Sequence, residues 1–134
     1  MQLLIGHGQV PTIMPEASEI PIYVQLRNQI VTGIGRGDLK EGERLPTVRQ
    51  LAQDAEVNTM TVNKAYQLLK TEGFITIDRR RGATVSPVQQ SDRRYREKLE
   101  AELELLSAEA RMKGMEQTEF LELCERVFAG MQPA

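Results

Sequence analysis

Two short helices are predicted by the stretch LPTVRQLAQDAEVNTMTVNKAYQLLKTEG, which spans residues 45–73. Thr47 can cap the first helix, and Gln50, three residues later, completes a capping box. Asn58 can cap the second helix after a tight break at residues 57–58. The second helix carries one apolar stripe at helical spacing, formed by Val62, Ala65, Tyr66 and Leu69. Two helices joined by about three residues, the second of them amphipathic, indicate a helix-turn-helix.

The elements on either side of this pair extend the pattern. Pro21 suits the first turn of an earlier helix, and apolar residues at helical spacing follow it. Residues 74–77 alternate like a β-strand, residues 83–85 answer them, and a charged turn at residues 78–82 joins the two. A hairpin directly after the second helix of the pair is a wing. Residues 21–87 are therefore predicted to form a winged helix-turn-helix domain of the α+β class, mainly α with a small β wing.

Residues 88–134 are predicted to add two helices, each with a narrow apolar seam. The seam of the first helix consists of Tyr95, Leu99, Leu103, Leu106 and Ala110. The seam of the second consists of Phe120, Cys124, Val127 and Phe128. Pairing with a second copy of the chain would bury apolar area that one small copy lacks. We expect residues 88–134 to be a helical dimerisation region; the alternative is that the seams pack on their own winged domain. Residues 1–20 are expected to be a tail or a short edge strand.

The composition favours a cytoplasmic protein without catalytic or metal chemistry. The single cysteine, Cys124, cannot form an intramolecular disulfide, and no Cys/His spacing suggests zinc. There is one histidine, and no nucleophile–histidine pair, paired-carboxylate signature or phosphate loop is recognisable. No apolar run approaches the eighteen or so residues that cross a bilayer, and no secretion signal is evident. We therefore expect no enzyme, no cofactor, no metal site and no membrane partner.

Charge is distributed unevenly along the chain, whose net charge is −2. Residues 1–88 hold ten Lys/Arg against nine Asp/Glu, whereas residues 89–134 hold seven against ten. A weakly basic front and an acidic rear suit a local DNA-contact surface better than bulk electrostatic attachment to nucleic acid.

Several linked motifs resemble the GntR family of bacterial transcription regulators. They lie at residues 21–26 (PIYVQL), 42–52 (GERLPTVRQLA), 57–66 (VNTMTVNKAY) and 72–75 (EGFI), with Arg81 and Gly82 in the wing. The resemblance covers roughly half of the chain and implies a DNA-binding regulator, by family habit a repressor. The short remainder of the chain resembles the YtrA subfamily, whose tail dimerises the protein and whose members often regulate transporter operons.

Physical reasoning places DNA contacts on the second helix of the pair. A helix fits the major groove, where the side chains opposite its buried stripe can read base edges. Asn63 could pair with adenine through two hydrogen bonds, and Thr61 could reach a phosphate or a thymine methyl. Backbone N–H groups at residues 58–61 are expected to be free for a phosphate. The predicted DNA-binding residues of the two helices are Thr47, Arg49, Asn58, Thr59, Met60, Thr61, Asn63 and Lys64.

Two groups of cations dominate this predicted surface. The resemblance implies that Arg49 contacts DNA, as an arginine does at that position in the family; the alternative is a surface ion pair. Arg79, Arg80 and Arg81 form the densest positive charge in the chain and would enter or straddle a minor groove from the wing tip. Gly82 lets the hairpin turn tightly and its backbone approach the DNA. The alternative for the wing is a solvated hairpin without a partner.

The predicted partners are double-stranded DNA and a second copy of the chain. One module reads only a short half-site, so we expect twofold dimers on an inverted-repeat operator. The family often has arginine where this chain has Asn63, so the operator sequence does not follow from the resemblance. The tail is too small for a private ligand pocket of the usual size, which leaves a small-molecule effector unknown. The rival interpretation is a winged-helix protein-interaction module without specific DNA binding.

Overall fold

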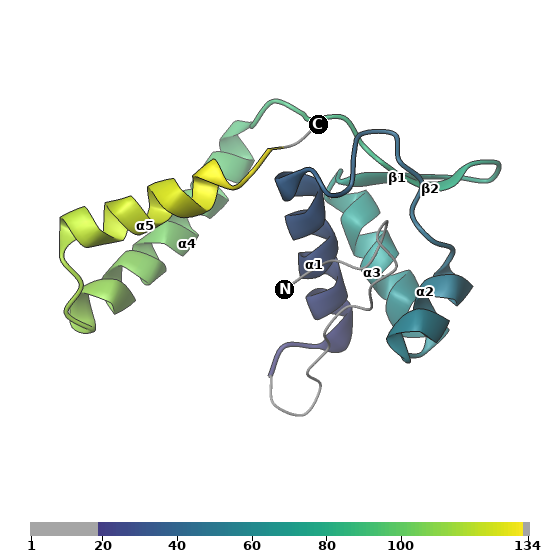
Figure 1. The fold of residues 1–134 in the computed structure, drawn as a ribbon, viewed down its shortest axis with the longest axis horizontal. Helices are drawn as coiled ribbons and strands as arrows, with labels where there is room; N and C mark the ends of the chain where they lie inside the picture. The colour runs from purple at the N-terminus through teal and green to yellow at the C-terminus, as the bar shows by residue number, and fades with distance from the viewer. Residues whose placement is uncertain (1–18, 133–134) are drawn as a thin grey trace. The chain divides into compact units, whose positions relative to one another are not determined.

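The computed structural model describes residues 19–132, so the tail or edge strand expected at residues 1–20 lies almost wholly outside the described residues. The described part of the chain forms five α-helices and one two-stranded antiparallel sheet (Figure 1). They divide into two compact units. One holds the described residues up to Val88 together with Gln132, and the other spans Gln89–Met131. The mainly α architecture with a small β wing agrees with the predicted α+β class.

The first unit contains three helices and a hairpin. Its elements are α1 (Ile22–Arg36), α2 (Val48–Ala55), α3 (Thr59–Thr71), β1 (Ile75–Asp78) and β2 (Gly82–Val85). The predicted capping box begins α2, since Thr47 Oγ1 accepts from the Gln50 N–H at 3.1 Å and Gln50 Oε1 accepts from the Thr47 N–H at 3.1 Å. Asn58 Oδ1 caps α3 by accepting from the Met60 N–H at 2.7 Å. Each cap satisfies a backbone N–H that the helix leaves unpaired, which stabilises the helix by about 1 kcal/mol.

A single aliphatic core holds this unit together. Its fully buried side chains are Leu26, Ile30, Leu39, Leu51, Val62, Leu69 and Ile75. They come from all three helices, from the loop after α1 and from the wing. The stripe predicted on α3 is confirmed, because Val62, Ala65, Tyr66 and Leu69 are all buried. Full burial of one such aliphatic side chain stabilises the fold by about 1.5–3 kcal/mol. The core therefore fixes which face of α3 points outward.

The turn between α2 and α3 rests on a left-handed residue that is not glycine. Glu56 has φ 56° and ends α2 as its C-cap. The next N–H, that of Val57, donates to the Ala52 carbonyl at 3.0 Å and closes the end of the helix. A left-handed conformation costs a residue with a Cβ about 1–2 kcal/mol. Only Val57 therefore separates Glu56, the C-cap of α2, from Asn58, the N-cap of α3.

The wing is a short antiparallel hairpin extended by a third segment. Ile75 pairs with Val85 and Asp78 with Gly82, whose φ of 73° suits glycine. The stretch before α2 is partly extended and forms a bridge between Arg44 and Thr84. Three backbone hydrogen bonds of 2.8–3.0 Å join this stretch to β2. The hairpin is therefore anchored on its β2 edge as well as by the chain leaving α3.

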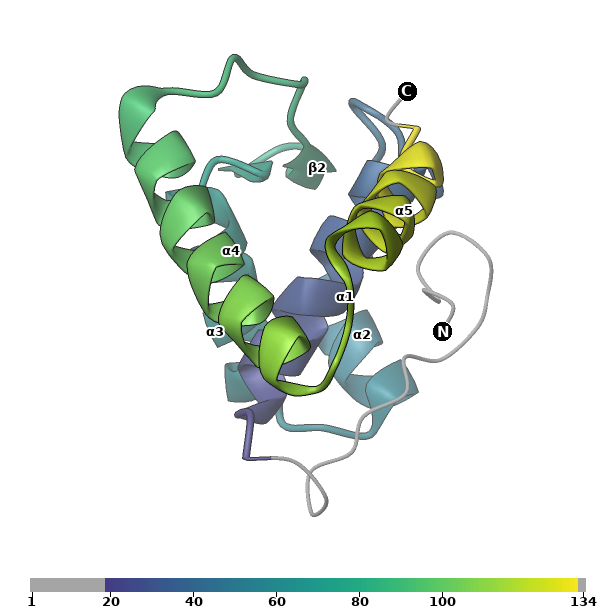
Figure 2. The same cartoon turned by 90° about the vertical axis from the view of Figure 1, so that its left-hand side faces the viewer.

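The second unit contains α4 (Arg93–Met112) and α5 (Gln117–Ala129), which diverge from the turn around Gly114 (Figure 2). Neither helix has a buried residue. Only Ala110, Met115 and Phe120, close to the turn, and Met131 are half-buried. The remaining large apolar side chains of both helices are exposed, namely Tyr95, Leu99, Leu103, Leu105, Leu106, Met112, Leu121, Leu123, Val127 and Phe128. Among the described residues, no helix is long and apolar enough to cross a membrane.

Candidate nucleic-acid interface

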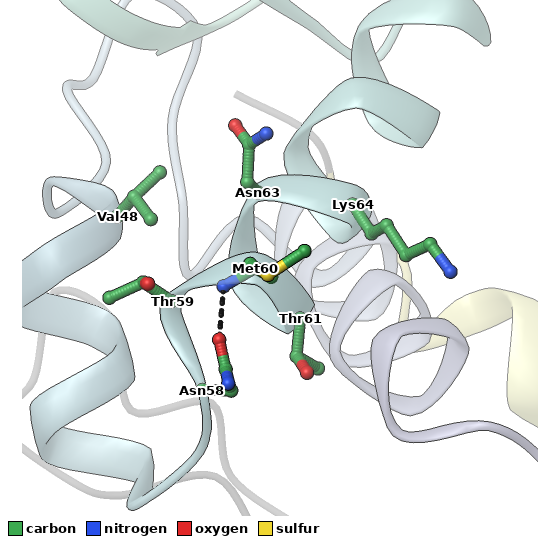
Figure 3. Close-up of a pocket in the computed structure, with 7 residues that line it drawn as sticks. All are labelled: Val48, Asn58, Thr59, Met60, Thr61, Asn63 and Lys64. Carbon is green, nitrogen blue, oxygen red and sulfur yellow. Dashed lines mark hydrogen bonds between the residues drawn. The ribbon is translucent and has the colours of Figure 1, made fainter.

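The outward face of α3 and the start of α2 border a shallow hollow of about 570 Å³ (Figure 3). Its lining residues are Val48, Asn58, Thr59, Met60, Thr61, Asn63 and Lys64. All of them except Val48 belong to the set predicted from the sequence. Met60 is 75% exposed, and Asn63 and Lys64 are also exposed. The structure therefore brings the predicted residues of α3 together on one open face.

Two of the predicted residues are occupied by helix capping. The Thr47 hydroxyl and the Asn58 amide oxygen each accept a backbone hydrogen bond. The expectation of free backbone N–H groups at residues 58–61 is wrong for Met60, whose N–H donates to the Asn58 side chain. It is wrong also for Thr61, whose N–H donates to the Asn58 carbonyl at 3.0 Å. Thr47 and Asn58 thus mark where α2 and α3 begin, and side chains rather than these two amides are available for contacts on the open face.

Asn63 and Lys64 leave neighbouring positions of α3 in different directions (Figure 3). The Lys64 ammonium lies 5.0 Å from the centroid of the Tyr23 ring on α1, a cation–π contact that the sequence pattern did not predict. The Asn63 side chain forms no hydrogen bond within the described residues and keeps both its donor and its acceptor free. Asn63 therefore suits recognition of a base edge, and Lys64 suits attraction of a nearby phosphate.

Arg49 lies exposed in the first turn of α2. Its guanidinium forms no ion pair or hydrogen bond within residues 19–132, so the alternative of a surface ion pair finds no support there. A free cation next to the hollow of α3 adds positive charge where a phosphate would lie beside the major groove.

The wing tip holds a second group of free cations. Arg79, Arg80 and Arg81 are exposed, and their side chains also lack a partner among the described residues. The backbone beneath them is fixed, because the Arg80 N–H donates to Asp78 Oδ1 at 2.7 Å. A Cβ placed on Gly82 would meet nothing within 4 Å, which leaves open space on that side of the turn. A wing tip with unpaired arginines suits the sugar-phosphate backbone or a narrow minor groove.

The sequence missed a half-buried hydrogen bond that joins α3 to the residue before the cap of α2. The Tyr66 hydroxyl on α3 donates to the Pro46 carbonyl at 2.7 Å, just before the cap of α2. Burial raises the pKa of Tyr66 well above its ordinary value, so the hydroxyl keeps its proton and donates. The spacing of Tyr66 identifies it as a core residue but contains no signal for its partner. This bond fixes the start of α2, and with it Arg49, relative to α3.

Among the described residues, no group of three or more His, Cys, Asp or Glu side chains could hold a metal ion. Cys124 is exposed on α5.

Comparison with known proteins gives matches over the first unit. The family described as "Bacterial regulatory proteins, gntR family" matches residues 22–85. The HTH-type transcriptional repressor YtrA of Bacillus subtilis is 42% identical over 69 residues, which make up 52% of this chain and 53% of that protein. The HTH-type transcriptional regulator Rv1152 of Mycobacterium tuberculosis is 38% identical over 72 residues, 54% of this chain and 60% of that protein. The match thus spans little more than half the length of these relatives.

Solved structures extend the likeness beyond residue 88. A transcriptional antiterminator from Listeria monocytogenes has a TM-score of 0.78 at 26% identity, covering 86% of this chain and 87% of that one. YtrA from Sulfolobus acidocaldarius, a GntR-family transcription factor, has a TM-score of 0.63 at 37% identity, covering 75% of this chain and 99% of that one. AraR(DBD) in complex with operator ORX1 has a TM-score of 0.54 at 25% identity, covering 60% of this chain and 100% of that one.

Proposed function

The chain belongs to the GntR family of bacterial regulatory proteins, with YtrA-like relatives, and on that premise we propose that it is a homodimeric repressor that binds an inverted-repeat operator. It is a DNA-binding transcription regulator rather than an enzyme, in keeping with relatives named as transcriptional regulators. Its site of action is the cytoplasm, where a bacterial chromosome lies. Control of a transporter operon is part of the proposal and follows from the resemblance to the YtrA subfamily alone.

The observation that carries the proposal is the open face of α3 bordered by unpaired cations. Thr59, Met60 and Asn63 offer side chains to base edges, with Asn63 able to pair with adenine through two hydrogen bonds. Arg49 and the three wing arginines have no partner within the described residues. Charges of this kind pair with phosphates and release condensed counterions, which makes the affinity depend on salt.

The relative AraR(DBD) was solved in complex with an operator, and we propose that this chain also binds operator DNA through its winged helix. The helix-turn-helix places its second helix in the major groove, and a wing that follows it reaches toward the adjacent minor groove. In this arrangement residues 21–87 form the DNA-binding domain. Arg79, Arg80 and Arg81 contact the sugar-phosphate backbone next to the half-site that α3 reads.

The dimer in the proposal rests on the exposed seams of α4 and α5. A helix pair without any buried residue leaves its apolar side chains in water, and such large exposed patches mark interaction sites. A second copy of residues 88–134 would cover the two seams. A dimer also reads two half-sites at once, which supplies the specificity that one short half-site lacks.

An electrophoretic mobility shift tests the function on DNA of the protein's own promoter at about 50 and 200 mM salt. We expect binding that weakens steeply with salt. Arg49→Ala should weaken binding about equally on all DNA sequences and reduce the slope of log affinity against log salt by about 1, as expected for the loss of one phosphate contact. The matched control is Arg111→Ala, which removes an exposed arginine from α4, and it should leave the affinity near that of the wild type. Absence of salt-sensitive binding to any DNA would refute the proposal and favour a protein-interaction module.

A further inference from the structure

Helix α3 and the wing are joined by a short link that contains a glycine, Gly73. Helix α3 ends at Thr71, and β1 begins at Ile75. Between them, Gly73 has φ 86°, a conformation in which glycine is favoured because it has no Cβ. The Gly73 N–H donates to the Lys70 carbonyl at 3.0 Å and the Phe74 N–H to the Leu69 carbonyl at 2.9 Å, so backbone hydrogen bonds close the link onto the end of α3. Side-chain contacts across the link can add to these bonds in setting the angle between the helix and the wing.

Arg27 of α1 lies across this link and contacts both of its sides. Its Nε donates to Glu72 Oε1 at 2.8 Å, and its Nη2 donates to Glu72 Oε2 at 3.2 Å. Its third nitrogen, Nη1, donates to Asn28 Oδ1 at 2.9 Å. The guanidinium also lies 5.5 Å from the centroid of the Phe74 ring, the residue directly before β1. All three nitrogens and one face of Arg27 are thus used within the unit.

This set of contacts differs from the other arginines of the winged helix. Arg49 and the wing arginines have no partner among the described residues, whereas Arg27 makes three hydrogen bonds with its five N–H groups and its side chain is only 20% exposed. A guanidinium that is already paired with a carboxylate and largely covered is a poor phosphate ligand. A two-pronged arginine–carboxylate pair does, however, fix orientation as well as distance. The geometry of Arg27 is suited to holding other residues in place.

We propose that Arg27 is a positioning residue for DNA binding, which through Glu72 and Phe74 sets the angle of the wing relative to α3. The inference rests on the proposed function and deepens it. Helix α1 provides a firm base, because Leu26 and Ile30 beside Arg27 are buried in the core. On the wing side, the Ser86 N–H donates to the Phe74 carbonyl at 3.0 Å, which ties the end of β2 to the same residue. Holding Phe74 therefore holds both strands of the wing.

The charge of Glu72 provides a sharp test. Glu72→Gln removes a negative charge from a DNA-binding unit, so electrostatics alone would tighten DNA binding. Loss of the clamp would instead free the wing and weaken binding. We expect Glu72→Gln to weaken binding to promoter DNA by about fivefold, a coupling of ordinary size between neighbouring residues. Glu41→Gln, which removes an exposed carboxylate from the loop before α2, is the matched control and should bind as tightly as the wild type or slightly more tightly.

A double-mutant cycle separates positioning from simple stability. The wing is disabled by replacing Arg79, Arg80 and Arg81 with alanine, and Glu72→Gln is measured again in that background. If Glu72 acts through the wing, its effect should shrink to less than about twofold, because the wing no longer contributes binding energy. A thermal melt confirms that each variant is folded. If Glu72→Gln melts too low, Arg27→Lys keeps the charge, loses the two-pronged bond and should show the same loss and the same coupling.

The outcomes are distinct. Wild-type protein that binds no DNA refutes the proposed function and this inference with it. Wild-type binding with no loss in either Glu72→Gln or Arg27→Lys overturns the inference alone. A loss that persists unchanged when the three wing arginines are absent also overturns it, since the pair would then act on α3 or on stability rather than on the wing.

Discussion

The two units of the chain differ in where their apolar side chains go. In the winged helix, the apolar faces of α1, α2, α3 and the hairpin meet in one core. In the second unit, α4 and α5 carry seams of similar periodicity, yet neither helix has a buried residue. Hydrophobic periodicity identifies which face of a helix is apolar, but it does not identify the molecule that covers that face. The first unit buries its apolar faces within one copy, whereas the seams of the second unit stay exposed, and we propose that a second copy covers them.

The largest effect should come from the core of the winged helix. Leu69 on α3 is fully buried, so Leu69→Ala leaves a cavity and should lower the free energy of unfolding by about 3 kcal/mol. Urea denaturation followed by circular dichroism measures this change. Val88→Ala, at a side chain that is 71% exposed, is the control and should change stability by less than about 0.5 kcal/mol. Equal losses in the two variants would mean that the described core does not hold the unit together.

A slightly smaller effect should follow from charging the seam of α4. Leu99→Asp places a carboxylate in the proposed dimer interface and should yield a monomer in light scattering at micromolar concentration. Binding to a two-half-site operator should weaken by about a hundredfold, because the second half-site is then no longer bound within the same complex. Binding to a single half-site should be unchanged, since the winged helix does not depend on the seam.

Ala101→Asp is the matched control for that experiment. Ala101 is exposed on the face of α4 opposite Leu99, so the same charge lies outside the seam. It should remain dimeric and bind the operator as the wild type does. Wild-type protein that is monomeric at micromolar concentration would refute the dimer directly and would leave the exposed seams to another partner.

Much of the winged helix was predictable because each of its signals is local. The caps at Thr47 and Asn58 and the stripe of α3 are encoded within one or two helical turns, and the structure confirms them. The left-handed residue between α2 and α3 was not predictable, because glutamate at position 56 contains no turn signal of the kind that glycine gives.

The contacts that the sequence missed all join residues far apart in the chain. Arg27 and Glu72 are 45 positions apart, and the extended segment at Arg44 pairs with β2 across the two helices that lie between them in the chain. Neither pairing produces a periodic pattern in the sequence, so neither can be predicted from the spacing of residues. The predicted DNA-contact residues share this limit, because the sequence predicts which side chains face outward but not which bases they would contact.

The smallest effect should come from the hydrogen bond that joins α2 to α3. Tyr66→Phe removes the hydroxyl that donates to the Pro46 carbonyl and should lower the free energy of unfolding by about 1 kcal/mol. Because burial raises the pKa of Tyr66 in the folded state, its contribution is complete below the ordinary tyrosine pKa of about 10 and declines as the pH rises above that value. The stability difference between wild type and Tyr66→Phe should therefore stay constant up to about pH 10 and shrink as the pH rises above it. A difference that stayed constant above that pH as well would show that the Tyr66 hydroxyl titrates normally and is open to water. The hydrogen bond that joins α3 to the start of α2 would then be absent, and the position of α2 relative to α3 would depend on core packing alone.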